Sequence, residues 1–272
     1  MQRTEMRNPN TMHIDKMSTY DIVKTMNDEN KTVTDAVDKA LPKIAQAVDA
    51  AADALKKNGR IIYIGAGTSG RLGVVDASEC PPTFGVEPGV VVGIIAGGLQ
   101  AMTTATESVE DSEDEGIKAV ERIGINKNDV LVGISAAGNA AFVIGAIKRA
   151  KEAGAVTVGL VCNEGCKIAS AADIVIIVDT GPEVITGSTR LKAGTSQKLV
   201  LNMISTGAMI LTGKVYENLM INVKPLNKKL HKRCTGIICE ITGVDEERAY
   251  SELEKADGSI RRAIENIKGE LS

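Results

Sequence analysis

Residues 60–80 read Arg60-Ile-Ile-Tyr-Ile-Gly-Ala-Gly-Thr-Ser-Gly-Arg-Leu-Gly-Val-Val-Asp-Ala-Ser-Glu-Cys80, and this stretch indicates the fold. Its first part, 61–64, is apolar and mostly β-branched, which is typical of a buried parallel strand. The glycines that follow allow a turn, after which Gly67, Thr68 and Ser69 stand where a helix begins. The free N–H groups of a first helical turn bind anions, most often phosphate. A plain strand-to-helix turn would have the same pattern.

Two ligand classes fit this turn. Gly65-x-Gly67-x-x-Gly70 matches the dinucleotide fingerprint, which also requires an acidic residue at the end of the next strand. That strand, 90–95, runs into Ala96-Gly97-Gly98 and no acidic residue. The paired hydroxyls of Thr68 and Ser69 suit a phosphate monoester, so the sequence favours a sugar phosphate over NAD.

The pattern of strand, glycine turn and helix repeats along the chain. Further apolar runs at 129–135, 155–161 and 173–178 complete a predicted parallel sheet of about five strands with helices on both faces, an α/β three-layer sandwich. A helical N-terminal segment (1–58) precedes this domain (59–225), and a small helical bundle (226–272) follows it. We expect Pro42 to kink or divide a helix at 32–57, and Pro81 and Pro82 to end the helix that carries Glu79.

Composition excludes several classes of function. The 272 residues carry a net charge of −3 and only 2% aromatic residues, without tryptophan, which argues against nucleic-acid binding. The start has no apolar core of a signal peptide, and no apolar run is long enough for a membrane span. The five cysteines are scattered, and Cys162-x-x-x-Cys166 lacks a second ligand pair nearby. We therefore expect a cytoplasmic protein without a metal site.

Ligands of such sheets lie beyond the carboxyl ends of the strands, where several polar side chains are expected. Ser135 and Asn139 follow the third strand and could reach a phosphate or a sugar hydroxyl. The long loop 179–193 offers Glu183 as an acceptor for a sugar hydroxyl. The loop also supplies hydroxyl groups and positive charge from Ser188, Thr189 and Lys192. A plain turn and a solvated loop are the alternatives.

Two glutamates stand out as candidates for acid and base catalysis. Glu79 follows the phosphate turn by one short helix, and Glu110 follows the glycines that close the second strand. Two carboxyl groups in different surroundings can divide the roles of proton donor and proton acceptor. Glu110 could equally belong to the solvated acidic start of a helix.

The segments Gly65–Gly73, Asp76–Thr83 and Gly181–Lys192 together resemble the N-acetylmuramic acid 6-phosphate etherases, which have a sugar-isomerase-type (SIS) domain of flavodoxin-like architecture. The resemblance covers nearly the whole chain. It implies elimination of D-lactate from N-acetylmuramic acid 6-phosphate and addition of water, giving N-acetylglucosamine 6-phosphate during recycling of cell-wall sugars. The family's acid matches Glu79 and its second catalytic glutamate, the base, matches Glu110. The resemblance further implies no metal or organic cofactor, and a homodimer whose sites are closed by the partner subunit.

One segment departs from the family. Where the etherases usually have Ser-Ala-Ser-Gly-Arg-Thr-Pro, this chain has Ser135-Ala-Ala-Gly-Asn-Ala-Ala141. Each lost charge-assisted contact would weaken phosphate binding by about 1.5–3 kcal/mol. Two other readings therefore stay open: a sugar-phosphate isomerase, and a binding regulator similar to the vertebrate glucokinase regulatory proteins, which carry two such domains.

Overall fold

The structure is a computed structural model that describes residues 2–104, 109–225 and 227–269. The chain divides into two compact units, one of residues 1–78 with 89–208 and one of residues 79–88 with 209–272. These units follow from packing, so the segment boundary that the sequence suggests at residue 58 stays a prediction. The predicted boundary at residue 226 lies outside the described residues.

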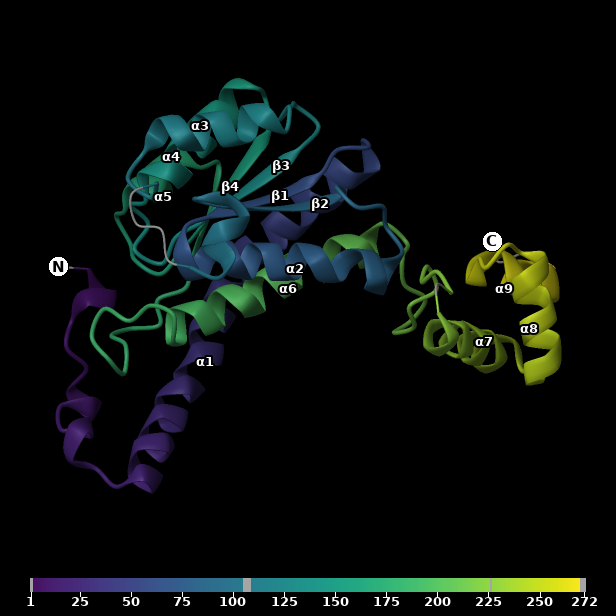
Figure 1. The fold of residues 1–272 in the computed structure, drawn as a ribbon, viewed down its shortest axis with the longest axis horizontal. Helices are drawn as coiled ribbons and strands as arrows, with labels where there is room; N and C mark the ends of the chain where they lie inside the picture. The colour runs from purple at the N-terminus through teal and green to yellow at the C-terminus, as the bar shows by residue number, and fades with distance from the viewer. Residues whose placement is uncertain (1, 105–108, 226, 270–272) are drawn as a thin grey trace. The chain divides into compact units, whose positions relative to one another are not determined.

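The first unit contains a parallel sheet of five strands in the order β2-β1-β3-β4-β5 (Figure 1). The strands are β1 Ile61–Gly65, β2 Val91–Ile95, β3 Val130–Ile134, β4 Val156–Val161 and β5 Ile174–Ile177. In the central register Tyr63 lies between Gly93 and Val132. All five predicted strands are confirmed, and the order is that of flavodoxin-like folds.

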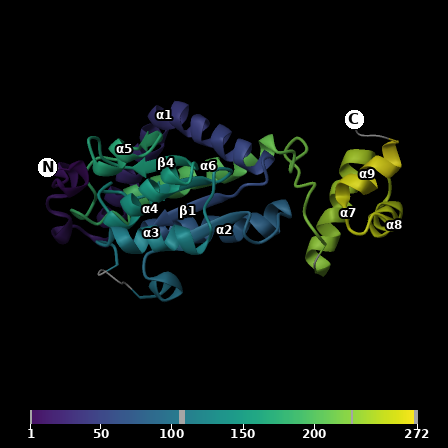
Figure 2. The same cartoon turned by 90° about the horizontal axis from the view of Figure 1, so that it is seen from above.

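Helices cover both faces of this sheet, as Figures 1 and 2 show. On one face α3 (Glu113–Arg122), α4 (Ala141–Glu152) and α5 (Lys167–Ala171) pack over Ile62, Ile64 and Leu131. On the other face lie α1 (Thr19–Lys56), α2 (Gly67–Phe84) and α6 (Lys192–Leu211). Tyr63 points to this second face, where its hydroxyl donates to the Leu201 carbonyl of α6 at 3.4 Å. Strands that are buried on both faces explain the unbroken apolar runs.

The prolines do not break the helices that contain them, and the expectation that Pro81 and Pro82 end their helix is wrong. Pro42 does not divide the N-terminal helix, because α1 runs from Thr19 to Lys56 with this proline inside it. A proline removes one main-chain hydrogen bond, and the buried contacts of Val37 and Ile44 hold the helix on both sides of that gap. Likewise α2 continues through Pro81 and Pro82 to Phe84, so Glu79 lies inside a helix and not at its end.

The N-terminal segment begins with three short 3-10 turns, η1 (Arg3–Glu5), η2 (Pro9–Thr11) and η3 (Ile14–Lys16), followed by α1. Ser18 caps α1, because its hydroxyl accepts a hydrogen bond from the Asp21 N–H at 3.2 Å. A further 3-10 turn, η4 (Gly98–Met102), follows β2.

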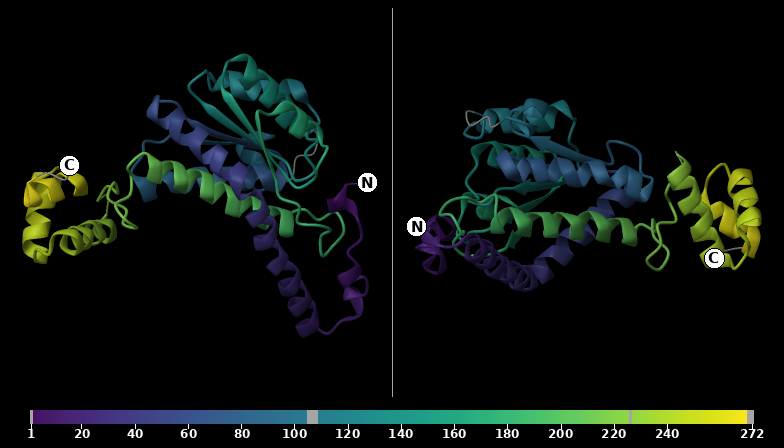
Figure 3. Two further views of the ribbon diagram at one scale, coloured as in Figure 1. Left: turned by 180° about the vertical axis from the view of Figure 1, so that it is seen from behind. Right: turned by 60° about the horizontal axis from the view of Figure 1, so that its bottom comes forward.

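The second unit contains the predicted helical bundle, formed by α7 (Lys228–Thr242), α8 (Glu246–Lys255) and α9 (Ile260–Lys268), which Figure 3 shows from two further directions. Each begins with a side-chain cap, from Asn227, Asp245 and Ser259 respectively. Their apolar faces enclose a small core around Ile238 and Leu253. Within the described part of the chain, no helix is both long enough and apolar enough to cross a membrane.

Candidate functional site

A cavity of about 150 Å³ lies at the carboxyl ends of the central strands, where the sheet topology predicts a ligand. Three segments and one acidic side chain enclose it: the start of α2, the turn after β3, the loop before α6, and Glu110. The lining residues are Ala66, Gly67, Thr68, Ser69, Glu110, Ile134, Ser135, Ala136, Ala137, Ala140 and Thr189. Segments far apart in the sequence therefore meet around one space, as expected.

The start of α2 supplies main-chain donors to this cavity. The first N–H groups of an α-helix have no partner within the helix, and the helix dipole places partial positive charge there. Gly67 has a φ of 52°, a left-handed conformation that other residues rarely adopt. A side chain on Gly70 would place its Cβ 2.5 Å from the Gly65 carbonyl oxygen, so only glycine lets the helix begin this close to the strand. The glycines are thus required by the shape of the turn.

The turn after β3 is held by hydrogen bonds to its main chain. Ser135 lines the cavity, and its hydroxyl accepts from the Gly138 N–H at 3.0 Å. The Ala136 carbonyl accepts from the side-chain amide of Asn163 at 3.0 Å, and the Ala137 carbonyl accepts from that of Gln2 at 2.9 Å. These bonds fix the turn without the larger side chains that the family usually has.

Asn139 has a partner different from the one we expected. Its side-chain oxygen accepts from the Lys167 N–H at 3.1 Å, next to the start of α5. Asn139 is exposed and is not among the residues that line the cavity. Its contact therefore stabilises the turn, and a contact of Asn139 with a phosphate stays a prediction.

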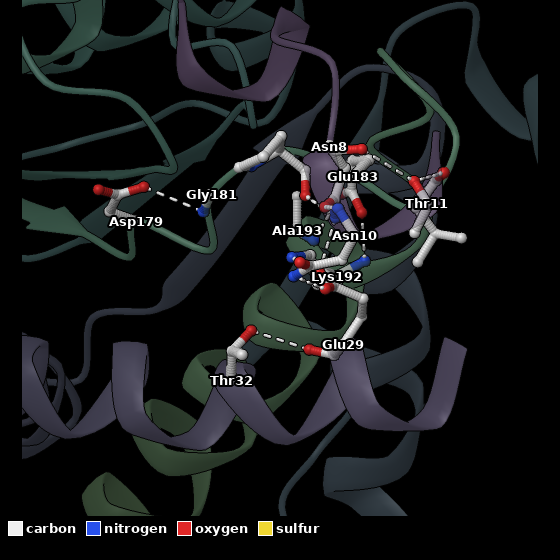
Figure 4. Close-up of polar contacts among 12 residues, drawn as sticks. Asn8, Asn10, Thr11, Glu29, Thr32, Asp179, Gly181, Glu183, Lys192 and Ala193 are labelled. Carbon is white, nitrogen blue, oxygen red and sulfur yellow. Dashed lines mark hydrogen bonds and ion pairs between the residues drawn. The ribbon is translucent and has the colours of Figure 1, made fainter. Parts of the chain in front are cut away.

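The loop before α6 contributes Thr189 to the cavity, whereas Ser188 is half-buried outside it. Glu183 is completely buried, at 0% exposure. Its two carboxylate oxygens accept from the N–H groups of Lys192 and Ala193, both at 2.9 Å (Figure 4). Glu183 therefore satisfies the first turn of α6, in place of the sugar hydroxyl that we expected as its partner.

Lys192 is likewise turned inward. Its ammonium lies 2.7 Å from the Glu29 carboxylate of α1, with side chains only 3% and 9% exposed (Figure 4). Asn8 and Asn10 donate to the same carboxylate at 2.7 and 2.8 Å. Burial alone would raise the pKa of Glu29, but the hydrogen bonds from Lys192, Asn10 and Asn8 outweigh it and lower that pKa. The positive charge of Lys192 is therefore neutralised within the fold and is not presented to the cavity.

The two candidate catalytic glutamates occupy different places. Glu110 lines the cavity, and its main-chain carbonyl accepts from the Phe142 N–H at 3.0 Å, which ties it to the start of α4. Glu79 is exposed and lies ten residues beyond Ser69 on α2. Because a helix rises about 1.5 Å per residue, Glu79 stands about 15 Å along α2 from Ser69. Of these two glutamates, Glu110 is among the described residues that line the cavity and Glu79 is not.

Several polar residues behind the cavity were missed by the sequence analysis. Gln197 bonds to Ser69, Asn163 holds the turn after β3, and Glu29 holds Lys192. Gln197 had one signal, since it interrupts an otherwise apolar helix. Glu29 had none, because its helix is rich in acidic and polar residues and nothing local marks the one that is buried.

Glu110 is the one charged residue among the described residues that line the cavity. Among its described lining residues none is a lysine or arginine, so an anion there would meet hydroxyl groups and main-chain N–H groups.

No group of three or more His, Cys, Asp or Glu side chains in the described ranges has an arrangement that could hold a metal ion. Cys162 is fully buried, and burial raises the pKa of its thiol to about 12.

Comparison with known proteins agrees with this geometry. Residues 43–151 match the family model of the glucokinase regulatory protein N-terminal SIS domain, and residues 100–206 match that of the SIS domain. The N-acetylmuramic acid 6-phosphate etherase of Clostridium beijerinckii is 53% identical over 96% of this chain and 86% of its own length. The chain belongs to the N-acetylmuramic acid 6-phosphate etherase family. The etherase of Caldanaerobacter subterraneus subsp. tengcongensis is 51% identical over 98% of this chain and 88% of its own.

Solved structures extend the likeness of this etherase-family chain at the level of fold. A phosphoheptose isomerase from Francisella tularensis superposes with a TM-score of 0.55 and 20% sequence identity, covering 71% of this chain and all of that one. At such low identity the match supports only the SIS-type architecture. It confirms the parallel three-layer sandwich that the sequence predicts.

Proposed function

We propose that this protein cleaves the D-lactyl ether of N-acetylmuramic acid 6-phosphate, releasing D-lactate and N-acetylglucosamine 6-phosphate. The observation that carries the proposal is a cavity that combines a helix N-terminus, hydroxyl groups and one carboxylate, Glu110. It occurs in a chain about half identical to curated etherases over nearly its whole length. A step in the recycling of cell-wall sugars would take place in the cytoplasm.

The 6-phosphate would bind at the start of α2. Gly67, Thr68 and Ser69 bring main-chain N–H groups and two hydroxyl groups to the cavity, and Ser135 and Thr189 bring two further hydroxyl groups. Hydroxyl groups that donate to a charged acceptor make strong hydrogen bonds. The helix dipole adds attraction for a dianion.

The reaction needs a base and an acid. With the sugar ring open, the aldehyde at C1 acidifies the proton on C2, and the Glu110 carboxylate removes that proton. The C3–O bond to lactate then breaks, and lactate leaves with a proton from Glu79. Water adds its oxygen at C3 and gives a proton back to Glu79, while Glu110 returns a proton to C2. The aldehyde takes up the electron pair during the elimination, so the reaction requires no electron-accepting cofactor.

Glu79 enters this scheme through a homodimer, as the family resemblance implies. In one chain it lies about 15 Å along α2 from Ser69, and its carboxylate is exposed. A twofold dimer exchanges equivalent residues between two sites. We therefore propose that Glu79 of each subunit serves the cavity of the other, next to that subunit's Glu110.

A regulator that binds sugar phosphates without turnover is the second candidate. It is favoured by the match to the glucokinase regulatory protein domain and by the altered turn at 135–141. Retention of both glutamates favours catalysis. A sugar-phosphate isomerase would bind a related ligand but would release no lactate.

The deciding experiment measures lactate released from N-acetylmuramic acid 6-phosphate by the purified protein with a coupled assay. We expect turnover by the parent, its loss in Glu79→Ala and Glu110→Ala, and its retention in Asp114→Asn, a control at an exposed acidic residue of α3. Binding of sugar phosphates without lactate release would support the regulator or the isomerase and overturn the etherase.

A further inference from the structure

A buried hydrogen bond joins the phosphate side of the cavity to the interior. The Ser69 hydroxyl in α2 lies 3.1 Å from the Gln197 side-chain oxygen in α6. The two residues are 8% and 1% exposed, and only Ser69 lines the cavity. The helices that carry them begin at the same end of the sheet and run side by side (Figures 1 and 3).

The helices are close at this point for a simple reason. Gly194, in the first turn of α6, has no side chain, and a Cβ there would lie 3.4 Å from the Thr68 methyl group. This approach brings Gln197, one turn further along α6, against Ser69. The amide is therefore held next to one of the hydroxyl groups proposed to bind phosphate.

The Ser69 hydroxyl cannot donate to Gln197 and to a phosphate at the same time. A serine hydroxyl has one proton, and here Ser69 donates it to the Gln197 oxygen. The hydroxyl then has no proton left for a phosphate, which accepts hydrogen bonds at each unprotonated oxygen. At the same time the Gln197 Nε2 atom is buried without a hydrogen-bond partner among the described residues, and buried unpaired donors are rare.

Turning the Gln197 amide by a half rotation answers both points. The nitrogen then takes the place of the oxygen and donates to Ser69 Oγ across the same distance. The carbonyl oxygen and the NH2 group of the amide are nearly equal in size, so the rotation needs no repacking. The Ser69 proton becomes free to point into the cavity, and the carbonyl that takes the other place is an acceptor, which proteins bury unpaired more often than a donor.

We propose that Gln197 is a positioning residue of the phosphate subsite: with phosphate bound, its amide donates to Ser69 and directs the only proton of that hydroxyl at the phosphate. The inference rests on the proposed phosphate subsite. It assigns a role to a residue that touches no substrate, and that role is specific for glutamine. Glutamate can only accept from Ser69 when ionised, and methionine fills the same volume without either bond.

The test is a double-mutant cycle with inorganic phosphate as the probe, its Kd measured by titration calorimetry. We expect Ser69→Ala to weaken phosphate binding about tenfold, Gln197→Met several-fold, and Gln197→Glu at least tenfold, each consistent with one charge-assisted hydrogen bond. In the Ser69→Ala background, Gln197→Met should change the Kd by less than about twofold, and Gln197→Glu should lose only the part of its effect that does not come from like-charge repulsion. Thermal melting checks that each variant is folded. Two Gln197 variants of different charge are used so that the test is still possible if one of them does not fold.

The outcomes separate the inference from the site on which it rests. If the Gln197 substitutions weaken phosphate equally with and without Ser69, the effect comes from charge or packing, and the inference is overturned. If Ser69→Ala leaves the phosphate Kd unchanged, the phosphate subsite itself is wrong. Parent-like affinity in both Gln197 variants, with Ser69→Ala impaired, would overturn the role of Gln197 alone.

Discussion

Lys192 and Glu29 form a buried ion pair, 2.7 Å from nitrogen to oxygen, between residues 163 positions apart in the sequence. The pair joins α1 to the first residue of α6, and the Glu183 carboxylate holds the main-chain N–H of the same lysine. The loop that supplies Thr189 to the cavity therefore ends at a fixed point.

Removing one partner of this pair should destabilise the protein strongly. We expect Glu29→Gln or Lys192→Met to lower the free energy of unfolding by about 3–5 kcal/mol, because each leaves a buried charge without its counterpart. The double replacement Glu29→Met with Lys192→Met should cost much less. Urea unfolding of the three variants measures this, with Lys31→Met as a control at an exposed ion pair. Additive losses in the double variant would show that the two charges do not depend on each other.

The same pair makes stability depend on pH in the acid range. The pKa of Glu29 in the folded protein lies below its ordinary value of 4.5, so the folded state holds the ionised form more strongly than the unfolded chain does. The resulting stabilisation is complete above that value and is lost as the pH falls through the lowered pKa. Unfolding free energies between pH 6 and pH 3 should fall less steeply in Glu29→Gln than in the parent. Parallel curves would remove Glu29 as a source of this dependence.

Glu110 can be tested at a step before lactate departs. If its carboxylate removes the C2 proton, Glu110→Gln should slow exchange of that proton with solvent deuterium by about 10²–10⁴-fold, since the amide cannot act as a base. Proton NMR of the substrate in deuterated water measures the exchange. Asp111→Asn, at the neighbouring exposed position, serves as the control. Exchange at the parent rate in Glu110→Gln would require a different base.

The proposed shared site predicts complementation between two inactive variants. Glu79→Ala and Glu110→Ala should each be inactive alone, and a mixture allowed to exchange subunits should recover about a quarter of the parent activity. Half of randomly paired dimers contain both variants, and each of these keeps one complete site of its two. Lactate release follows the recovery, and a mass measurement of the mixed dimers controls for exchange. Exchanged dimers without activity would place both glutamates in one chain's site or outside catalysis.

The strands and the glycine turn at the start of α2 could be predicted from the sequence because their causes are local. Apolar β-branched runs mark buried strands, and Gly67 and Gly70 mark a helix that begins close to a strand. The end of α2 could not be predicted, because two successive prolines usually end a helix, whereas α2 continues through Pro81 and Pro82 to Phe84. Neighbouring residues in the sequence decide where the strands and the glycine turn form, whereas tertiary packing decides where α2 ends.

The roles of polar loop residues were harder to predict for a related reason. Glu183 and Lys192 have residue types that suit a ligand, and their partners are the N–H groups at the start of α6 and the carboxylate of Glu29. Asn139 similarly bonds to the Lys167 N–H. A sequence names the donors and acceptors, but their pairing depends on segments that meet only in the folded chain.

The start of α2, with its glycines and main-chain donors, has a consequence for how this site can change over time. A backbone N–H is present whatever the side chain, so substitutions in neighbouring turns, including the small residues at 136–141, leave that part of the proposed anion site intact. Substitutions around such a site are tolerated, whereas substitutions of the glycines that shape it are not. An engineer who wanted a different sugar would therefore keep residues 65–70 unchanged and vary the side chains that face the rest of the ligand.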